Sequence, residues 1–409
     1  MNGADTAWII VATALVLFMT LPGLALFYGG LVRARNVLSV FMHCYAIACL
    51  MSVLWLALGY SIAFGGGDSG YWGGLDKIFL LNVTSDSLSG TLPEVLFFAF
   101  QMTFAIITPA LIVGAYVERV GFAFVMAFSG LWMLLCYAPV VHWIWGGGML
   151  SDGGILGAIG VKDFAGGIVV HETAGLAALV LAFFLGSRKN KTKPPHNPGY
   201  VMIGAAMLWV GWFGFNAGSA VAADSSASMA MLVTHISAAV GALTWMSIEW
   251  IKQGKATIIG IATGMVAGLA TITPAAGSVG PAGALLIGVM AGYICFYATQ
   301  AIKGYFHIDD SLDVFPVHGV GGILGIIMIS FLGSPEGFLG SGASGIAEGG
   351  VWVQLKAQLL GITVIAAWTG LATYLIIRAI SVFTDIRVSE DVESEGVDIN
   401  EHNEQGYSF

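Results

Sequence analysis

The sequence predicts an all-α polytopic membrane protein with eleven transmembrane helices. Of its 409 residues, 57% are hydrophobic and only 10% are charged, which leaves too little polar surface for a soluble protein of this length. The mean hydropathy is +0.86, and apolar stretches near the roughly 20 residues that a bilayer requires recur along the chain. A soluble globular fold is therefore excluded, and no nucleic-acid partner is expected.

The predicted helices follow the apolar stretches, and glycine or proline within them is no objection because lipid offers the backbone no other hydrogen-bond partner. The start, MNGADTAWII, lacks the basic region and cleavage site of a signal peptide, so the first stretch is expected to stay in the protein. We expect helices at about 7–31, 37–64, 94–117, 122–145, 164–186, 200–220, 225–250, 256–274, 281–302, 312–333 and 351–383.

The lysines and arginines predict the orientation. If the N-terminus is outside, the loops after odd-numbered helices are cytoplasmic, and they carry 12 of the 15 basic residues, among them Lys191 and Lys193. Lys77, Lys162 and Lys356 are left for the external face. The positive-inside rule therefore predicts an N-terminus outside and a cytoplasmic C-terminus.

Two stretches with one pattern give the strongest functional signal. Asp163–Gly175 is DFAGGIVVHETAG and Asp310–Gly322 is DSLDVFPVHGVGG, so an aspartate precedes His171 and His318 by eight residues each. The first stretch opens helix five from outside and the second opens helix ten from inside. We therefore predict an inverted repeat of helices one to five and six to ten, followed by a long eleventh helix. Eight helical residues rise about 12 Å in a hydrocarbon core about 30 Å thick, so the two imidazoles approach the midplane from opposite faces.

The paired histidines leave three interpretations open. An ionisable residue inside a membrane segment marks a function by default, although each ring could instead be a hydrogen-bonded core residue. A zinc site is disfavoured, because Gly175 stands where an HExxH motif needs its second histidine and no cysteine has ligand spacing. We favour a polar station for a small neutral solute, since a neutral imidazole donates through one nitrogen and accepts through the other. No metal or cofactor is expected, and no set of residues indicates an enzyme.

Several long motifs resemble the ammonium transporter (Amt/Mep) family. They are DFAGGIVVHETAG, DSLDVFPVHGVGG, FYGGLVRARN (27–36), GWFGFNAGS (211–219), ITPAAG (272–277) and EGVDINEH (395–402). The resemblance covers nearly the whole chain and is to the prokaryotic Amt branch. It implies a homotrimer with one pore per subunit in a bacterial or archaeal plasma or inner membrane. It also implies ammonium as the transported solute, with methylammonium as a second candidate.

The resemblance implies an external ammonium site with a gate beneath it. Phe100, Trp145 and Ser219 match the site that recruits the cation. An aromatic face attracts a cation within about 6 Å with roughly 0.5 to 2 kcal/mol, and a serine hydroxyl can accept a hydrogen bond. Phe104, one turn below Phe100, and Phe215 match a stacked phenyl gate. The alternative for Trp145 is the aromatic belt at the membrane interface.

Below the gate, the resemblance makes His171 and His318 the twin histidines of the pore, with Trp212 and Thr273 lining the site. A bare ion in an apolar tube meets a Born penalty of tens of kcal/mol in the idealised limit. We therefore expect ammonium to lose its proton and to cross as ammonia, with or without separate proton transfer. Potassium cannot lose its charge in this way and would be rejected.

Acidic residues at the heads of helices five and ten are expected to be helix caps. Asp163 would satisfy free backbone N–H groups and complement the helix dipole, and electrostatic help to ammonium is the alternative role. Asp310 and Asp313 are expected to do the same at helix ten. Glu172 departs from the family pattern, and it should point away from the pore because adjacent helical residues face different ways.

The chain is expected to divide into a transmembrane domain, 1–383, and an acidic cytoplasmic tail, 384–409. From Glu390 to Glu404 the tail has seven acidic residues, against the single basic residue Arg387. Composition alone predicts a solvated tail. The resemblance implies instead a tail packed against the inner loops, where a PII-type regulatory protein would dock.

Two rival functions stay open. One is an ammonium sensor with little flux, in which binding at the external site changes the tail. The other is a Rhesus-like gas channel, which is disfavoured by Trp145 and by the pair Phe104 and Phe215 with Ser219.

Overall fold

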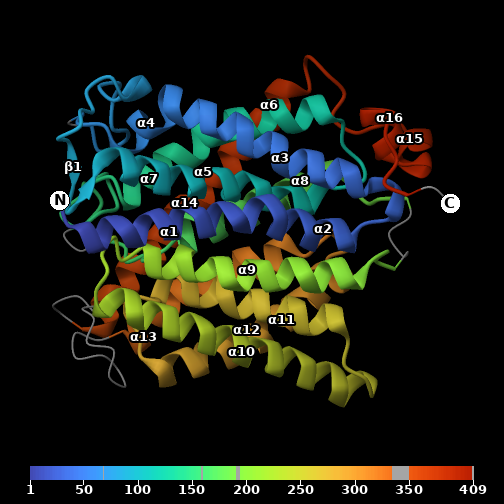
Figure 1. The fold of residues 1–409 in the computed structure, drawn as a ribbon. Coiled ribbons are helices and arrows are strands. Elements are labelled where there is room, and N and C mark those ends of the chain that lie inside the picture. The colour runs from blue at the N-terminus through green and yellow to red at the C-terminus, as the bar shows by residue number, and fades with distance from the viewer. Residues whose placement is uncertain (68, 158–159, 190–193, 334–349, 408–409) are drawn as a thin grey trace.

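The structure is a computed structural model that describes residues 1–67, 69–157, 160–189, 194–333 and 350–407. Within these ranges, eleven helical segments are long and apolar enough to cross a membrane. They run side by side, and the two termini lie at opposite ends of the bundle (Figure 1). We call these ends the N-terminal face and the C-terminal face. All eleven predicted helices are confirmed.

The first half of the bundle holds spans one to five. Span one contains α1 (Gly3–Phe18), η1 (Met19–Leu24) and α2 (Ala25–Leu31), and span two contains η2 (Ala34–Asn36), α3 (Val37–Leu54), η3 (Trp55–Gly59) and α4 (Tyr60–Phe64). The following loop contains η4 (Ile78–Leu80) and the antiparallel pair β1 (Leu88–Ser89) and β2 (Leu92–Pro93). Span three is α5 (Glu94–Tyr116), span four contains α6 (Phe122–Trp132), η5 (Met133–Tyr137) and α7 (Ala138–Ile144), and span five contains η6 (Gly167–Glu172) and α8 (Thr173–Leu185).

The second half holds spans six to ten. Spans six to eight are α9 (Pro198–Gly218), α10 (Ser225–Gln253), and α11 (Ile258–Ile272) with η7 (Thr273–Ala275). Span nine contains α12 (Pro281–Gln300) and η8 (Ala301–Tyr305), and span ten contains η9 (Phe315–Gly319) and α13 (Val320–Leu332). Span eleven is α14 (Val351–Ile380), and the tail holds α15 (Glu390–Glu395) and α16 (Val397–His402).

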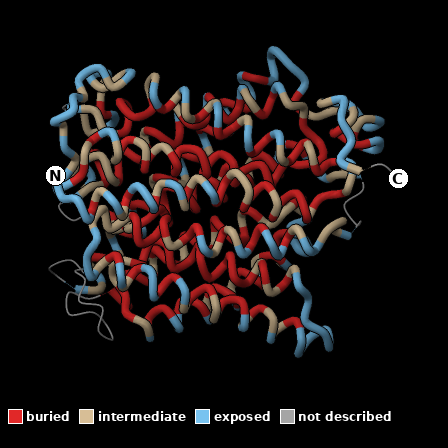
Figure 2. The backbone as a smooth tube through the Cα atoms, viewed as in Figure 1, coloured by how far each residue is buried: buried red, intermediate tan, exposed pale blue. Residues whose placement is uncertain are grey.

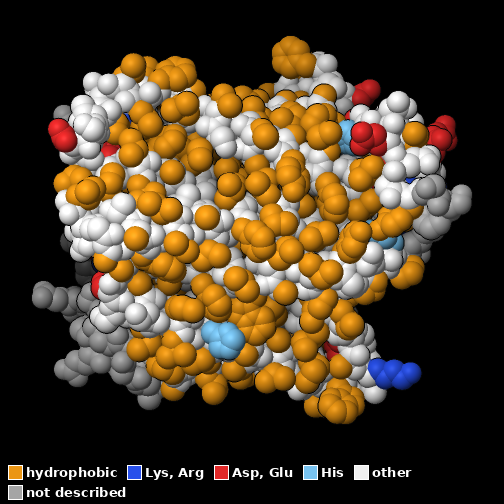
Figure 3. All heavy atoms as spheres, in the orientation of Figure 1, with side chains coloured by type: hydrophobic (Ala, Val, Ile, Leu, Met, Phe, Trp, Pro, Cys, Tyr) orange, Lys and Arg blue, Asp and Glu red, His pale blue; other side chains and the backbone are white. Residues whose placement is uncertain are grey.

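The bundle is apolar outside as well as inside. Buried positions run along the inner sides of the helices, and exposed ones lie on the outer sides and at the ends (Figure 2). Hydrophobic side chains cover the middle of the face in view, whereas charged side chains gather near its ends (Figure 3). Phe183 on α8 and Leu243 on α10 are among the large exposed apolar residues. Such a surface suits lipid, since a water-exposed apolar surface of this extent is rare.

The two halves pack on each other symmetrically. η6 packs against α13 and η9 packs against α8, so the opening turn of each half's last helix lies on the other half. The glycine four residues after each histidine makes this crossing close. A Cβ atom at Gly175 would come within 2.4 Å of the backbone of Gly319, and one at Gly322 within 2.4 Å of the carbonyl oxygen of Gly167. The inverted repeat therefore requires glycine at the same position of both halves.

The acidic tail is folded against the C-terminal face. The carboxylate of Asp398 accepts hydrogen bonds from the amides of Leu38 (3.0 Å) and Ser39 (2.8 Å) at the start of α3. Glu401 accepts one from the amide of Phe122 (2.8 Å) at the start of α6. Negative side chains are favourable at helix N-termini. The acidic residues therefore bind the tail to the bundle. The tail is packed against the inner loops and is not a solvated segment.

The orientation of the bundle in the membrane stays a prediction from charge. Arg33, Arg119 and Arg188 lie with the tail at the C-terminal face, where they bond to Glu118 and Asp309. Of the basic residues that carry the prediction, Lys191 and Lys193 lie outside the described residues.

Candidate functional site

His171 and His318 meet in the interior of the bundle. Each lies in a π-helical turn, η6 or η9, and each is buried. Their Nδ1 atoms are 3.2 Å apart and their ring centroids 5.2 Å apart. One ring must donate through Nδ1 and the other must accept, so two imidazolium ions could not form this bond. The arrangement is a hydrogen-bonded pair contributed equally by the two halves.

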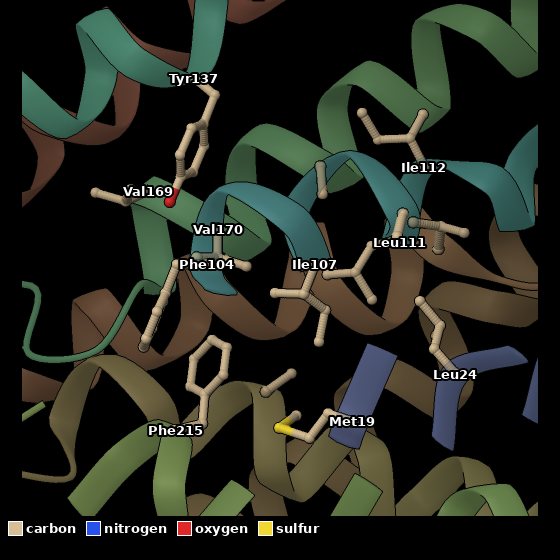
Figure 4. Close-up of a cluster of buried hydrophobic side chains, with 14 of the residues drawn as sticks. Met19, Leu24, Phe104, Ile107, Leu111, Ile112, Tyr137, Val169, Val170 and Phe215 are labelled. Carbon is tan, nitrogen blue, oxygen red and sulfur yellow. The ribbon is translucent and has the colours of Figure 1, made fainter. Parts of the chain in front are cut away.

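A column of rings leads from the histidine pair to the N-terminal face. The ring centroids of His171 and Phe215 are 6.0 Å apart, those of Phe215 and Phe104 are 4.3 Å apart, and those of Phe104 and Trp145 are 6.1 Å apart. The rings of Phe104 from α5 and Phe215 from α9 lie against one another (Figure 4). The phenyl pair therefore separates the histidines from the N-terminal face.

Trp145 ends this column at the N-terminal face, and Ser219 and Phe100 lie beside it. Trp145 is partly exposed, and its Nε1 donates to the carbonyl oxygen of Asp163 (2.8 Å), which fixes the indole. Ser219 donates its hydroxyl proton to the carbonyl of Phe215 (2.8 Å), so the lone pairs of its oxygen stay available to accept. Phe100 is fully buried and packs edge-on against Phe104 at 5.1 Å. Trp145 and Ser219 thus reach solvent, whereas Phe100 supports the gate from behind.

Narrow apolar space lies between the gate and the histidines. A cavity of about 10 Å³ occurs there, room for about one water molecule. Trp212 donates its Nε1 proton to Oγ1 of Thr273 (2.8 Å), so Thr273 holds the indole that forms part of the wall. The cavity is lined by Met19, Leu24, Phe27, Ile107, Leu111, His171, Leu208, Trp212, Phe215, Val266 and His318.

Wider cavities open at both ends of the path. At the C-terminal face a cavity of about 430 Å³ reaches His318 and has Arg188, Asp309 and Asp313 in its wall. At the N-terminal face a cavity of about 730 Å³ has Trp145 and Asp163 in its wall. The narrow section thus meets the C-terminal cavity, or C-terminal vestibule, at His318, and the N-terminal cavity, or N-terminal vestibule, reaches the ring column at Trp145.

Asp163 caps the start of η6. Its Oδ1 accepts from the amides of Gly166 and Gly167, and its Oδ2 accepts from those of Ile168 and Val169, at distances between 2.6 and 3.0 Å. Burial raises the pKa of this carboxyl above its ordinary value, and the four amide hydrogen bonds act in the opposite direction. The backbone around the first histidine thus depends on one buried side chain.

The two aspartates before His318 make different interactions. Asp310 is fully buried, and its Oδ2 accepts from the amide of Phe315 (2.7 Å) at the start of η9. Asp313 instead forms an ion pair with Lys303 (2.8 Å). Asp313 also has a φ of +61°, a left-handed conformation that is uncommon for a residue with a side chain.

Asp310→Asn is expected to remove a pH dependence of stability. Burial, and then the charge of Asp313, raise the pKa of Asp310 to about 6. The stabilisation that this group gives in its protonated form is present below its unfolded pKa near 3.8, and it is lost as the pH rises through about 6. The free energy of unfolding is expected to fall by an amount on the order of 3 kcal/mol over this pH range. Thermal unfolding in detergent between pH 4 and 7.5 should show a steeper decline for the wild type than for the variant. Asp385→Asn, at an exposed position, serves as control, and parallel curves for wild type and Asp310→Asn would contradict the expectation.

Glu172 does not line the narrow cavity. It is fully buried and is absent from the residues that line the narrow cavity. Within the described residues, neither of its carboxyl oxygens has a hydrogen-bond partner. The structure therefore places it away from the pore without an ion pair in this part of the chain.

Sequence reasoning missed an ionic cluster around the C-terminal vestibule. Asp309 bonds to Arg119 (2.9 Å) and Arg188 (3.0 Å), and Glu118 bonds to Arg188 (2.9 Å) and Arg33 (3.0 Å). Burial acts to raise the pKa of Asp309, but the hydrogen bond and charge of Arg188 outweigh it and lower the pKa to about 2. The sequence does contain a signal for this cluster, because these acidic residues lie at helix ends together with arginines. We used those arginines only to predict the orientation.

Comparison with known proteins assigns the family. A family model described as Ammonium Transporter Family matches residues 7–407. The chain belongs to the ammonium transporter family. A putative ammonium transporter of Methanothermobacter thermautotrophicus is 44% identical over 409 residues, with 100% of this chain and 99% of the relative covered. The ammonium transporter of Bacillus subtilis is 42% identical, with 100% and 99% covered.

Solved structures agree with this assignment. Mep2 of Candida albicans superimposes with a TM-score of 0.86 at 35% identity, covering 96% of this chain and 87% of the other. A structure named Sensor Amt Protein gives a TM-score of 0.87 at 27% identity, covering 98% of each chain. This ammonium transporter is accordingly a multi-pass plasma membrane protein of a transport family and not an enzyme.

Proposed function

We propose that the ammonium transporter binds NH4+ at the N-terminal face, removes its proton near the phenyl gate and conducts NH3 past His171 and His318. The observation that carries this proposal is the 3.2 Å contact between the two imidazoles inside an otherwise apolar lumen. In this proposal the N-terminal face is external and the C-terminal face is cytoplasmic.

The narrow section favours a neutral solute on energetic grounds. Transfer of an unpaired ion into such surroundings costs far more than a side-chain hydrogen bond returns. Ammonia has one lone pair and three N–H groups, so it can donate to one imidazole nitrogen and accept from another. The histidine pair thus offers polar contacts to ammonia at the place where the remaining wall offers few.

Recruitment at the external end would select a cation. Trp145 presents an aromatic surface beside solvent, and Ser219 presents an oxygen that can accept from ammonium. Such a site binds weakly, because an exposed cation–π contact contributes only about 0.5 to 1 kcal/mol. Weak binding lets the substrate move on once Phe104 and Phe215 separate.

Three further attributes belong to the same proposal. The released proton follows its own route, with or without net charge movement. The functional unit is a homotrimer with one pore in each subunit. The folded tail beside the C-terminal vestibule is the surface on which a PII-type regulatory protein would act.

A sensor is the second candidate function, and two observations support it. The chain resembles a structure named Sensor Amt Protein across nearly its whole length. Its tail also contacts the loops that surround the C-terminal vestibule, because Arg33 of that vestibule donates to the carbonyl of Glu393 (2.9 Å). Ammonium binding would then be read out by the tail with little flux.

Current recorded from purified protein on a solid-supported membrane during an ammonium jump tests the proposal. The wild type should give a current, and His171→Ala should reduce it by about tenfold, the effect of losing a hydrogen bond of about 1.4 kcal/mol. Phe183→Ala provides the control, because Phe183 lies on the same span and is 76% exposed. Ammonium binding without current or uptake would contradict the transport proposal and support the sensor function.

A further inference from the structure

The vestibule at the N-terminal face contains a lysine that the proposed transport path does not use. Lys162 and Asp152 line the same cavity as Trp145. Lys162 directly precedes Asp163 and is one of three basic residues predicted for the external face. Its side chain ends in a primary ammonium group, the same chemical class as the substrate.

Asp152 holds this ammonium group. Nζ of Lys162 is 2.6 Å from Oδ2 of Asp152, and Oδ1 of Asp152 accepts from the amide of Gly160 (2.8 Å). The side chains are 32% and 66% exposed, respectively, so both charges remain in contact with solvent. The hydrogen bond from Lys162 is the main cause of the lowered pKa of Asp152, so the charged form of this carboxyl is favoured.

The backbone of Lys162 is fixed relative to the external site. Its amide donates to Oε1 of Gln358 (2.9 Å), and its carbonyl accepts from Nε2 of the same side chain (2.7 Å). Gln358 is fully buried on α14. The carbonyl of the next residue, Asp163, accepts from Trp145. The indole of Trp145 is therefore held by the residue that directly follows Lys162, and the backbone of Lys162 is held by Gln358.

We propose that Lys162 and Asp152 set the affinity of the external site for ammonium, with Lys162 repelling the cation and Asp152 offsetting that repulsion. This inference rests on the proposed function. The geometry places a positive charge in the wall of the same cavity as Trp145. The adjacent negative charge reduces its field to that of a dipole. Removing either partner leaves the other uncompensated.

The expected effect is moderate, because both charges face water. Two unit charges about 10 Å apart interact by roughly 0.4 kcal/mol at the dielectric constant of water and by about four times as much at an effective constant near 20. The vestibule lies between these limits, so a change of about threefold in apparent affinity is expected at low ionic strength. Salt should weaken it, since the Debye length falls from about 30 Å at 0.01 M to about 3 Å at 1 M.

The test is the ammonium concentration that gives half-maximal current on a solid-supported membrane. At low ionic strength Lys162→Gln should lower this concentration by about threefold and Asp152→Asn should raise it by about threefold. The double variant should return close to the wild-type value. At 1 M sodium chloride the differences should disappear. Lys356→Gln is the matched control, because Lys356 is exposed on α14 near the same face but does not line the cavity.

The outcomes separate the inference from the proposed function. A wild type that binds ammonium without carrying current would overturn the proposed function. A wild type with normal currents, and a Lys162→Gln variant with unchanged half-maximal concentration at low ionic strength, would overturn only the inference. The same conclusion follows if the shifts persist at high salt, because the pair would then act through structure and not through its charge.

Discussion

Replacing His318 by alanine is expected to make the transporter conduct potassium. In the wild type, the space beside this ring is about 10 Å³, and both imidazoles line it. Removing the ring joins that space to the C-terminal vestibule, which His318 also lines. Water can then accompany an ion into the narrow section, and the desolvation penalty that rejects potassium falls.

Potassium and ammonium jumps on the same solid-supported membrane measure this change. The wild type should give an ammonium current without a potassium current, whereas His318→Ala should give a potassium current of at least about a tenth of its ammonium current, a barrier difference of about 1.4 kcal/mol. His235→Ala is the control, because His235 is exposed on α10 and does not line the narrow cavity. Unchanged discrimination in His318→Ala would show that the imidazole is not part of the selectivity barrier.

Asp163→Ala is expected to cause a large loss of stability. Four backbone amides donate to the carboxylate of Asp163, and alanine would leave all four without that partner. An unsatisfied buried group costs about 1 to 3 kcal/mol, so the total loss is on the order of 4 kcal/mol or more. The first turn of η6, with His171 in it, would lose its fixed position.

The thermal unfolding midpoint of the detergent-solubilised protein reports this loss. Asp163→Asn should fall between the wild type and the alanine variant, because an amide oxygen can still accept two of the four hydrogen bonds. Asp86→Ala, at an exposed position near the same face, should leave the midpoint unchanged. An alanine variant as stable as the wild type would mean that water replaces the cap.

The fold could be predicted from the sequence to a large extent because lipid restricts the structures that a chain can adopt. A chain in hydrocarbon must satisfy its backbone within each segment, so apolar length alone locates helices. The matched spacing of His171 and His318 then predicted two halves of opposite direction. The structure has η6 on α13 and η9 on α8, which is the packing that such a repeat requires.

Local geometry at the site could not be predicted in the same way. A π-helical turn contains one extra residue per turn, and no composition signal distinguishes it from an α-helix, so the turns around both histidines were not expected. The burial of Phe100 and the pairing of Asp313 with Lys303 depend on neighbours from other helices. The folding of the tail depends on helix N-termini distant in sequence, to which Asp398 and Glu401 bind.

Conduction of ammonia as proposed requires an uncharged imidazole pair that shares one hydrogen bond inside an apolar pore. Solid-state nitrogen NMR of histidine-labelled protein in bilayers tests this most directly, with signals assigned through His171→Ala and His318→Ala. At pH 7 both rings should be neutral, and one protonated and one unprotonated Nδ1 should be coupled through their hydrogen bond. Two imidazolium signals, or two rings without such coupling, would contradict the proposal.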